Sequence, residues 1–253
     1  AAGQRLSGKP VRQAREAYEE RERLQAHKVW RGSPYRGLEH FDVDHADIFF
    51  GRRKPITELL AHLKQRAGEG NPFVMLLGMS GVGKSSMVNA GLLPMLREPD
   101  VVEGVKAWRT VRYRPSEEPD RPIAGLLNAL QREDGFGDLG DDVVLTAEMQ
   151  HEPESFGARL RARLEELAAA EGLEDGQLRC FMFIDQFEEL FTNDDLEESV
   201  RVNFTRIIRA CVQSAGVWTV CAMRSDSFPR IQEYPALVDL RARGGDKDLL
   251  PPN

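Results

Sequence analysis

Residues 78–85 read Gly-Met-Ser-Gly-Val-Gly-Lys-Ser and match the pattern G-x-x-x-x-G-K-[ST] at every fixed position. An apolar run, residues 73–77, precedes them, and a helix-compatible stretch follows. Glycine allows backbone angles that side chains forbid, so successive N–H groups can turn inward around phosphate oxygens at the start of a helix. A glycine-rich turn without a ligand is less consistent with this strand-and-helix context. The segment is therefore predicted to be a P-loop, which binds nucleotide phosphates.

The residue types in this loop suggest individual roles. Lys84 is predicted to reach the β- and γ-phosphates, and Ser85 to place its hydroxyl on Mg²⁺, a hard cation that prefers oxygen ligands. Ser86 is interpreted as a helix-start residue rather than as a second metal ligand. The complete set of nucleotide contacts predicted for the loop is Gly78, Ser80, Gly81, Val82, Gly83, Lys84, Ser85 and Ser86.

A second apolar run, residues 179–184, ends in an aspartate, Asp185. Continuous apolar runs are typical of buried parallel strands, whose carboxyl ends face the phosphate crevice. Asp185 is therefore predicted to be the Walker B residue and to hold Mg²⁺ directly or through water; the alternative is a structural aspartate at the edge of the core. Glu188 and Glu189 follow on the turn that leaves the strand, and either could orient the attacking water. We prefer Glu188; the alternative is a pair of solvated glutamates at a helix start.

Arg224 follows a third apolar run, residues 217–223. At the carboxyl edge of the same sheet, an arginine is placed to sense the terminal phosphate. A surface salt bridge is the alternative interpretation. The sequence contains no Asn-Lys-x-Asp tetrapeptide of the kind that reads guanine in Ras-type GTPases, so ATP or ADP is the expected nucleotide.

Apolar runs and helical patterns alternate along the chain. Strands are predicted at 73–77, 107–113, 179–184 and 217–223, and helices at 55–67, 84–96, 123–132, 154–170 and 197–214. The segment 137–150 is predicted to be an acidic loop. Such alternation favours an α/β fold with a mostly parallel sheet and helices on both faces.

Composition limits the other possibilities. The chain has 253 residues, 41% of them hydrophobic, which is enough for one main domain, and a net charge of −7. An acidic chain of this kind is not expected to bind nucleic acid or an anionic membrane over a broad surface. No apolar run approaches the ~18 residues of a membrane span. The three cysteines form no C-x-x-C pair and are expected to be reduced core residues of a cytoplasmic protein.

Several motifs in order resemble those of STAND-class NTPases, and in particular the bacterial novel-STAND group. They are Pro34-Tyr35-Arg36-Gly37-Leu38, Phe49-Phe50-Gly51-Arg52, the P-loop with Gly91-Leu92-Leu93-Pro94 behind it, the segment FIDQFEELF at 183–191 and the segment MRSD at 223–226. The resemblance implies an α/β P-loop NTPase with a mostly parallel five-stranded sheet, in which the sensor strand that ends at Arg224 lies between the P-loop and Walker B strands. It also implies that Phe50, Gly51 and Arg52 lie near the base or ribose.

The resemblance further implies a domain organisation and a function. Residues 1–32 would be a charged helical linker and residues 33–253 the NTPase domain of a larger protein. An N-terminal effector, a C-terminal helical and winged-helix region and a sensor would lie outside this chain. The expected function is an ATP/ADP switch with slow hydrolysis that controls self-association or effector activation in signalling or anti-phage defence, with Lys84, Asp185, Glu188, Glu189 and Arg224 as the catalytic set. The alternative is a module that binds nucleotide for structure or oligomerisation without hydrolysing it.

Overall fold

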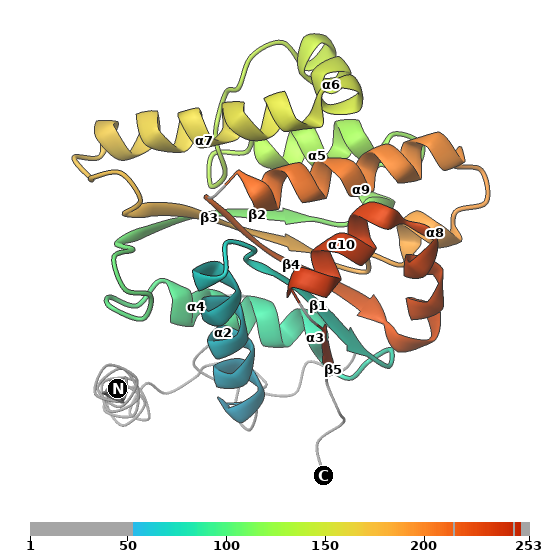
Figure 1. Cartoon of the computed structure of the whole chain (residues 1–253), viewed down its shortest axis with the longest axis horizontal. Helices are drawn as coiled ribbons and strands as arrows, with labels where there is room; N and C mark the ends of the chain where they lie inside the picture. The colour runs from blue at the N-terminus through green and yellow to red at the C-terminus, as the bar shows by residue number, and fades with distance from the viewer. Residues whose placement is uncertain (1–52, 215, 245, 249–253) are drawn as a thin grey trace, which may run out of the picture.

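A parallel sheet lies at the centre of the computed structural model, which describes residues 53–214, 216–244 and 246–248 (Figure 1). The predicted linker and the predicted base contacts Phe50, Gly51 and Arg52 lie outside these ranges. The strands are β1 (Phe73–Gly78), β2 (Ala107–Tyr113), β3 (Leu178–Ile184), β4 (Val217–Arg224) and β5 (Asp246–Asp248). They form one five-stranded sheet in the order β2-β3-β4-β1-β5, and all four neighbouring pairs are parallel.

Helices cover both faces of the sheet. They are α2 (Arg53–Gly68), α3 (Lys84–Ser86), the π-helical η2 (Met87–Leu92), α4 (Leu93–Leu96), the 3₁₀ turn η3 (Pro115–Glu117), α5 (Pro122–Leu130), α6 (Asp142–His151), α7 (Pro153–Ala170), α8 (Glu189–Thr192), α9 (Glu198–Gln213), the 3₁₀ segment η4 (Ser225–Glu233) and α10 (Pro235–Gly244). In Figure 1, α5, α6, α7 and α9 lie above the sheet, and α2, α3 and α4 lie below it. The predicted α/β class with helices on both faces is confirmed.

The strands read as continuous apolar runs because both of their faces are buried. In β1, Phe73, Met75 and Leu77 belong to the core shared with α5, α7 and α9. Val74 and Leu76 belong to the second core, shared with α2 and the helix that follows the P-loop. Successive side chains of a strand point to opposite faces, so one strand contributes to two cores and ties the layers together.

The strand order confirms the predicted position of the sensor strand. β4 pairs with β1 on one side and with β3 on the other, so it lies between the P-loop and Walker B strands. The fifth strand, β5, pairs with β1 from the other side. Its three residues, Asp-Lys-Asp, carry no apolar pattern, which is why the sequence did not indicate where it lies.

The prediction of an acidic loop over 137–150 was wrong, because α6 occupies its second half. The Asp141 side chain caps this helix by accepting from the backbone N–H groups of Val143 and Val144. Leu145 and Met149, one helical turn apart, are buried in the core. A capping aspartate followed by an i,i+4 apolar pair is a helix signal that the overall acidity of the segment obscured.

The three cysteines, Cys180, Cys211 and Cys221, are free and buried, as predicted. Burial raises the pKa of each thiol, to about 12 for Cys211. These cysteines are therefore packing residues rather than reactive thiols.

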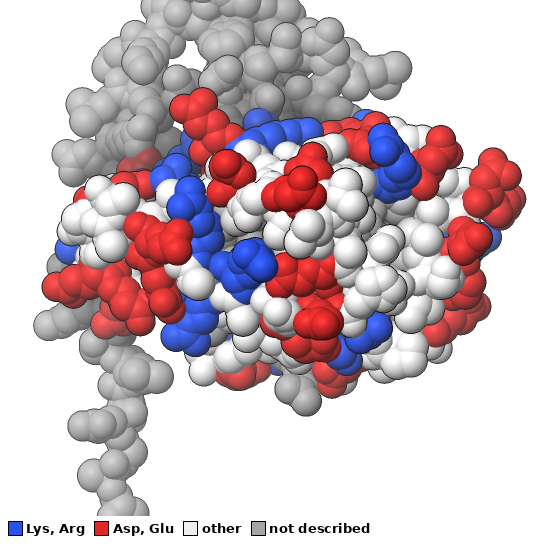
Figure 2. Space-filling view, turned by 90° about the horizontal axis from the view of Figure 1, so that it is seen from above, with Lys and Arg blue, Asp and Glu red and all other residues white. Residues whose placement is uncertain are grey.

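Acidic and basic side chains are interspersed on the face of the molecule shown in Figure 2. Along α7, Arg161 pairs with Glu165 and Arg163 pairs with Glu166. Among the described helices, none is both long and apolar enough to cross a membrane.

Candidate functional site

The predicted P-loop joins the end of β1 to the start of α3. Gly81 and Gly83 have φ angles of 73° and 89°, in the left-handed region that L side chains rarely adopt. The loop therefore needs glycine at these two positions of the motif. Helical structure then runs from Lys84 to Leu96, as predicted, although its middle turns are wound as the π-helix η2. A π-helical turn inside an α-helix is rare and is frequently found at functional sites.

Lys84 folds back over the loop. Its ammonium donates hydrogen bonds to the carbonyl oxygens of Gly78 (2.7 Å) and Met79 (3.0 Å). Burial lowers the pKa of Lys84, whereas the negative charges of Glu188 and Asp185 act to raise it. Both carboxylates are therefore close enough to influence the Lys84 charge, so the structure brings these three predicted site residues together.

Asp185 directly follows β3, as predicted for a Walker B residue, and is only 9% exposed. Its Oδ1 accepts a hydrogen bond from the backbone N–H of Gln186 at 3.0 Å. Gln186 has a φ of 50°, an uncommon angle for a residue with a side chain, and so marks a sharp turn after the strand. This turn leads the chain from Asp185 to Glu188.

The structure separates the two glutamates that the sequence left as alternatives. Glu188 is 8% exposed, and its Oε2 accepts a hydrogen bond from the backbone N–H of Arg224 at 3.2 Å. Burial raises the pKa of the Glu188 carboxyl, and the backbone donors and Lys84 partly oppose this shift. Glu189 Oε2 instead accepts from the backbone N–H of Ser116 at 3.1 Å, in an exposed contact with η3. Only Glu188 therefore contacts the end of the sensor strand.

Arg224 lies beside the P-loop in the sheet. It is the register partner of Gly78 across the β1–β4 pair. Its guanidinium forms an exposed ion pair with Asp226 (2.5 Å). The structure thus places the Arg224 backbone at the predicted site, while its side chain is paired with an acidic neighbour.

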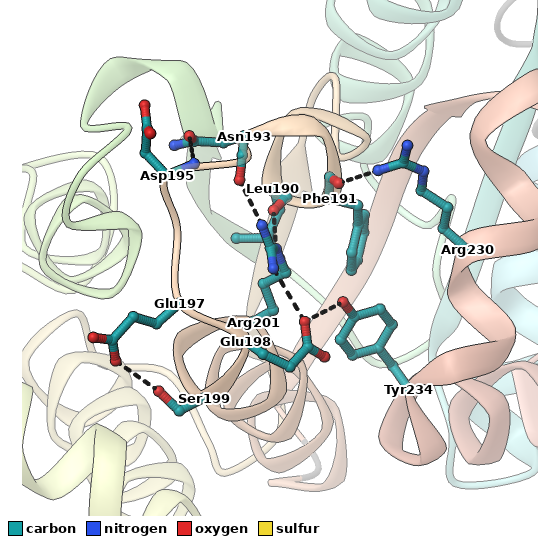
Figure 3. A network of polar contacts seen from close by, with 10 residues as sticks. All are labelled: Leu190, Phe191, Asn193, Asp195, Glu197, Glu198, Ser199, Arg201, Arg230 and Tyr234. Carbon is teal, nitrogen blue, oxygen red and sulfur yellow. Dashed lines mark hydrogen bonds and ion pairs between the residues drawn. The ribbon is translucent and has the colours of Figure 1, made fainter.

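A polar network fixes the segment that follows Glu188 (Figure 3). Arg201 of α9 donates to the carbonyl oxygens of Leu190 (3.1 Å) and Asn193 (2.5 Å) and pairs with Glu198. Glu198 also accepts from the Tyr234 hydroxyl at 3.2 Å, and Arg230 of η4 donates to the Phe191 carbonyl. The helix α8 is thereby tied both to α9 and to the segment that follows Arg224.

Replacing Arg201 with Ala is expected to lower the free energy of unfolding by about 1–3 kcal/mol, because partly buried carbonyls lose their charged donor. Denaturant unfolding followed by circular dichroism measures this loss. Arg161→Ala is the matched control, since its exposed pair with Glu165 is worth less than about 1 kcal/mol. Equal effects of the two substitutions would show that the Arg201 contacts contribute no more than a surface ion pair.

Sequence reasoning missed a cleft beside Asp185. It has a volume of about 490 Å³ and lies where β2 and β3 end; among its lining residues are Asn89 of η2, Arg114, Arg132 and Asp185. Arg114 Nη2 lies 3.6 Å from Asp185 Oδ2. The available signal was the position of Arg114, which directly follows the strand over residues 107–113, as Asp185 and Arg224 follow theirs.

The oxygen donors at the site suit Mg²⁺. Ser85, 8% exposed, offers a hydroxyl, and Asp185 offers a carboxylate, both hard donors. The described ranges contain no cluster of three or more His, Cys, Asp or Glu side chains that would form a metal site by itself. In nucleotide sites Mg²⁺ takes one or two protein ligands and completes its shell with phosphates and water, so this small donor set fits.

Comparison with solved structures finds the same fold at low sequence identity. The Aeropyrum pernix ORC2 protein, solved as ADPNP–ADP complexes, matches with a TM-score of 0.52 and 15% identity over 80% of this chain and 48% of that chain. Weaker matches are C. elegans PCH-2 (TM-score 0.46, 18% identity, 83% and 47% of the chains) and Drosophila ORC bound to DNA (0.48, 11%, 91% and 59%). This chain thus spans about half the length of the solved chains.

Comparison with curated proteins gives no match. A family model described as Novel STAND NTPase 1 matches residues 34–252, nearly the whole chain. The match covers the P-loop and the strand ends that carry Asp185 and Arg224. The chain belongs to this family of novel STAND NTPases and is a nucleotide-binding P-loop NTPase module.

Proposed function

We propose that this module is an ATP/ADP switch with slow ATP hydrolysis, which controls self-association or effector activation in a larger cytoplasmic signalling or anti-phage defence protein. The observation that carries the proposal is the hydrogen bond from the Arg224 backbone to Glu188, beside the strand that leads into the P-loop. It joins a buried acid to the end of the sensor strand. The loss of the terminal phosphate, when ATP becomes ADP, can thus act on both Glu188 and Arg224.

Each residue of the site has a defined task in this proposal. The loop N–H groups and Lys84 hold the phosphates, and the partial burial of Lys84 strengthens its attraction to them. Ser85 and Asp185 hold Mg²⁺, which neutralises phosphate charge when bound. Glu188 orients or deprotonates the attacking water. Its hydrogen bond with the Arg224 N–H fixes the carboxylate near the phosphate end of the site.

Arg224 provides the difference between the ATP and ADP states. In the structure its guanidinium pairs with Asp226 through an exposed contact of low energetic weight. A γ-phosphate offers a stronger, doubly charged acceptor. Transfer of Arg224 from Asp226 to this phosphate would move the start of η4, which Arg230 and Tyr234 connect to α8 and α9. Only ATP makes this contact, so only ATP shifts the equilibrium.

Arg224→Ala is expected to weaken the binding of ATP roughly five- to tenfold more than the binding of ADP, because only ATP has the phosphate that the guanidinium contacts. Equilibrium titrations with both nucleotides measure the ratio. Asp226→Ala is the control: it releases Arg224 from its partner, so the preference for ATP is retained or increased. If Arg224→Ala lowered the affinities for ATP and ADP equally, Arg224 would act only through its general positive charge and would not sense the γ-phosphate.

Adenine is proposed as the base because the sequence lacks the guanine-reading tetrapeptide. Phe50, Gly51 and Arg52 are the proposed base or ribose contacts. The ADPNP–ADP complexes of the A. pernix ORC2 protein are compatible with this choice, since that protein shares the fold. Steady-state hydrolysis of ATP and GTP by the purified chain tests the proposed activity and its base preference together.

A further inference from the structure

The Asp185 carboxylate has a contact on each of its oxygens. Oδ1 accepts from the backbone N–H of Gln186, and Oδ2 lies 3.6 Å from Arg114 Nη2. The first contact is local to the turn after β3. The second comes from the end of β2, which is the neighbouring strand in the sheet. A metal that binds Oδ2 must therefore compete with a guanidinium.

The pair between Arg114 and Asp185 is loose enough to be exchanged. Its N···O distance of 3.6 Å is long for a charge-assisted hydrogen bond, and the Arg114 side chain is 35% exposed. Ion pairs with this much solvent access are worth about 1 kcal/mol or less. Arg114 can thus leave Asp185 at low cost.

Arg114 has room to move away from Asp185. Both residues line the same cleft, which has a volume of about 490 Å³. A guanidinium that leaves Asp185 can therefore stay in contact with solvent in this cleft.

We propose that Arg114 is a positioning residue that holds Asp185 in the metal-free site and competes with Mg²⁺ for its carboxylate. When Mg²⁺ binds, Arg114 would release Oδ2 and move into the cleft that it lines. The Mg²⁺ concentration that the site requires is therefore set partly by Arg114, which directly follows β2. This inference rests on the proposed function, because it takes Asp185 as the metal-side carboxylate.

The test is a titration of Mg²⁺ at a fixed concentration of a fluorescent ATP analogue, with nucleotide binding as the readout. Arg114→Ala is expected to lower the Mg²⁺ concentration at half-saturation about threefold, because the competitor for Asp185 is gone. Arg114→Lys keeps the charge and is expected to return this concentration toward the wild-type value. Binding of the same analogue in EDTA is expected to be the same for wild type and Arg114→Ala.

Arg132→Ala is the matched control. Arg132 lines the same cleft but contacts Glu117 and the Arg112 carbonyl instead of Asp185, so its loss is expected to leave the Mg²⁺ requirement unchanged. In an Asp185→Asn background, Arg114→Ala is also expected to leave the Mg²⁺ concentration at half-saturation unchanged, because the carboxylate that Arg114 competes for is absent. The four variants form a double-mutant cycle that isolates the interaction between the two residues.

The outcomes separate the inference from the proposed function. A wild-type protein that binds the analogue equally with and without Mg²⁺ would overturn the metal assignment of the proposed function. Metal-dependent binding with an unchanged or increased Mg²⁺ requirement in Arg114→Ala would overturn only the role of Arg114. Weaker binding of Arg114→Ala in EDTA would also overturn that role, because it would show that Arg114 contacts the nucleotide itself.

Discussion

Lys84→Ala is expected to lower the affinity for ATP and ADP roughly 10- to 100-fold while the domain stays folded. A charged hydrogen bond in a partly desolvated site contributes about 1.5–3 kcal/mol, which corresponds to this range. Among the described residues, Lys84 donates to carbonyls of its own loop, those of Gly78 and Met79, so the two cores keep their packing. Titration calorimetry gives the affinities, and thermal unfolding tests the fold.

Lys64→Ala is the matched control for Lys84→Ala. Lys64 also donates to a carbonyl, that of Val101, but it lies on α2 outside the P-loop. Its replacement is expected to leave nucleotide affinity unchanged. If the two substitutions had the same effect on ATP affinity, the assignment of Lys84 to the phosphates would be wrong.

Glu188→Gln is expected to lower the hydrolysis rate by about 10²- to 10⁴-fold, the usual contribution of a general base, with ATP affinity preserved. The substituted amide has nearly the same shape, and its oxygen can still accept from the Arg224 N–H. Single-turnover hydrolysis and equilibrium binding measure the two quantities separately. Glu189→Gln is the control, because Glu189 contacts Ser116 and is expected to leave the rate within about threefold of wild type.

The pH dependence provides a second readout for Glu188. Burial raises its pKa above the ordinary 4.5 of a glutamate, so the carboxylate is protonated at a higher pH than an exposed one. A base must be ionised to act, so the wild-type rate is expected to fall as the pH drops through this raised pKa. Glu188→Gln lacks this acid limb. A wild-type protein that binds ATP but shows no turnover at any pH would favour the non-hydrolysing module instead.

The sequence predicted those parts of the fold that depend on long apolar patterns. β2 was predicted with the bounds that the structure shows, and β1, β3 and β4 within one residue, because strands buried on both faces leave continuous apolar runs. β5 could not be predicted in this way. It is short and polar, and it pairs with the edge of β1 opposite β4 through backbone contacts that any side chain permits.

The candidate site could also be predicted only in part. The P-loop spacing and the positions at the ends of apolar strands were enough to propose Lys84, Asp185 and Arg224 as site residues, because strand ends in a parallel sheet meet at one edge. The sequence left open the choice between Glu188 and Glu189, since that choice depends on the turn at Gln186. It also did not reveal the Arg114 contact with Asp185, which requires knowing that β2 is the neighbour of β3.

The loop from Gly78 to Ser85 is proposed to bind an adenine nucleotide. The most direct test is a competition titration in Mg²⁺ buffer, in which unlabelled ATP and GTP displace a fluorescent ADP analogue from the wild-type protein. We expect saturable binding at one site per chain, displacement by ATP, and at least tenfold weaker displacement by GTP. The absence of saturable binding, or equal displacement by GTP, would show that the loop is not an adenine-nucleotide site.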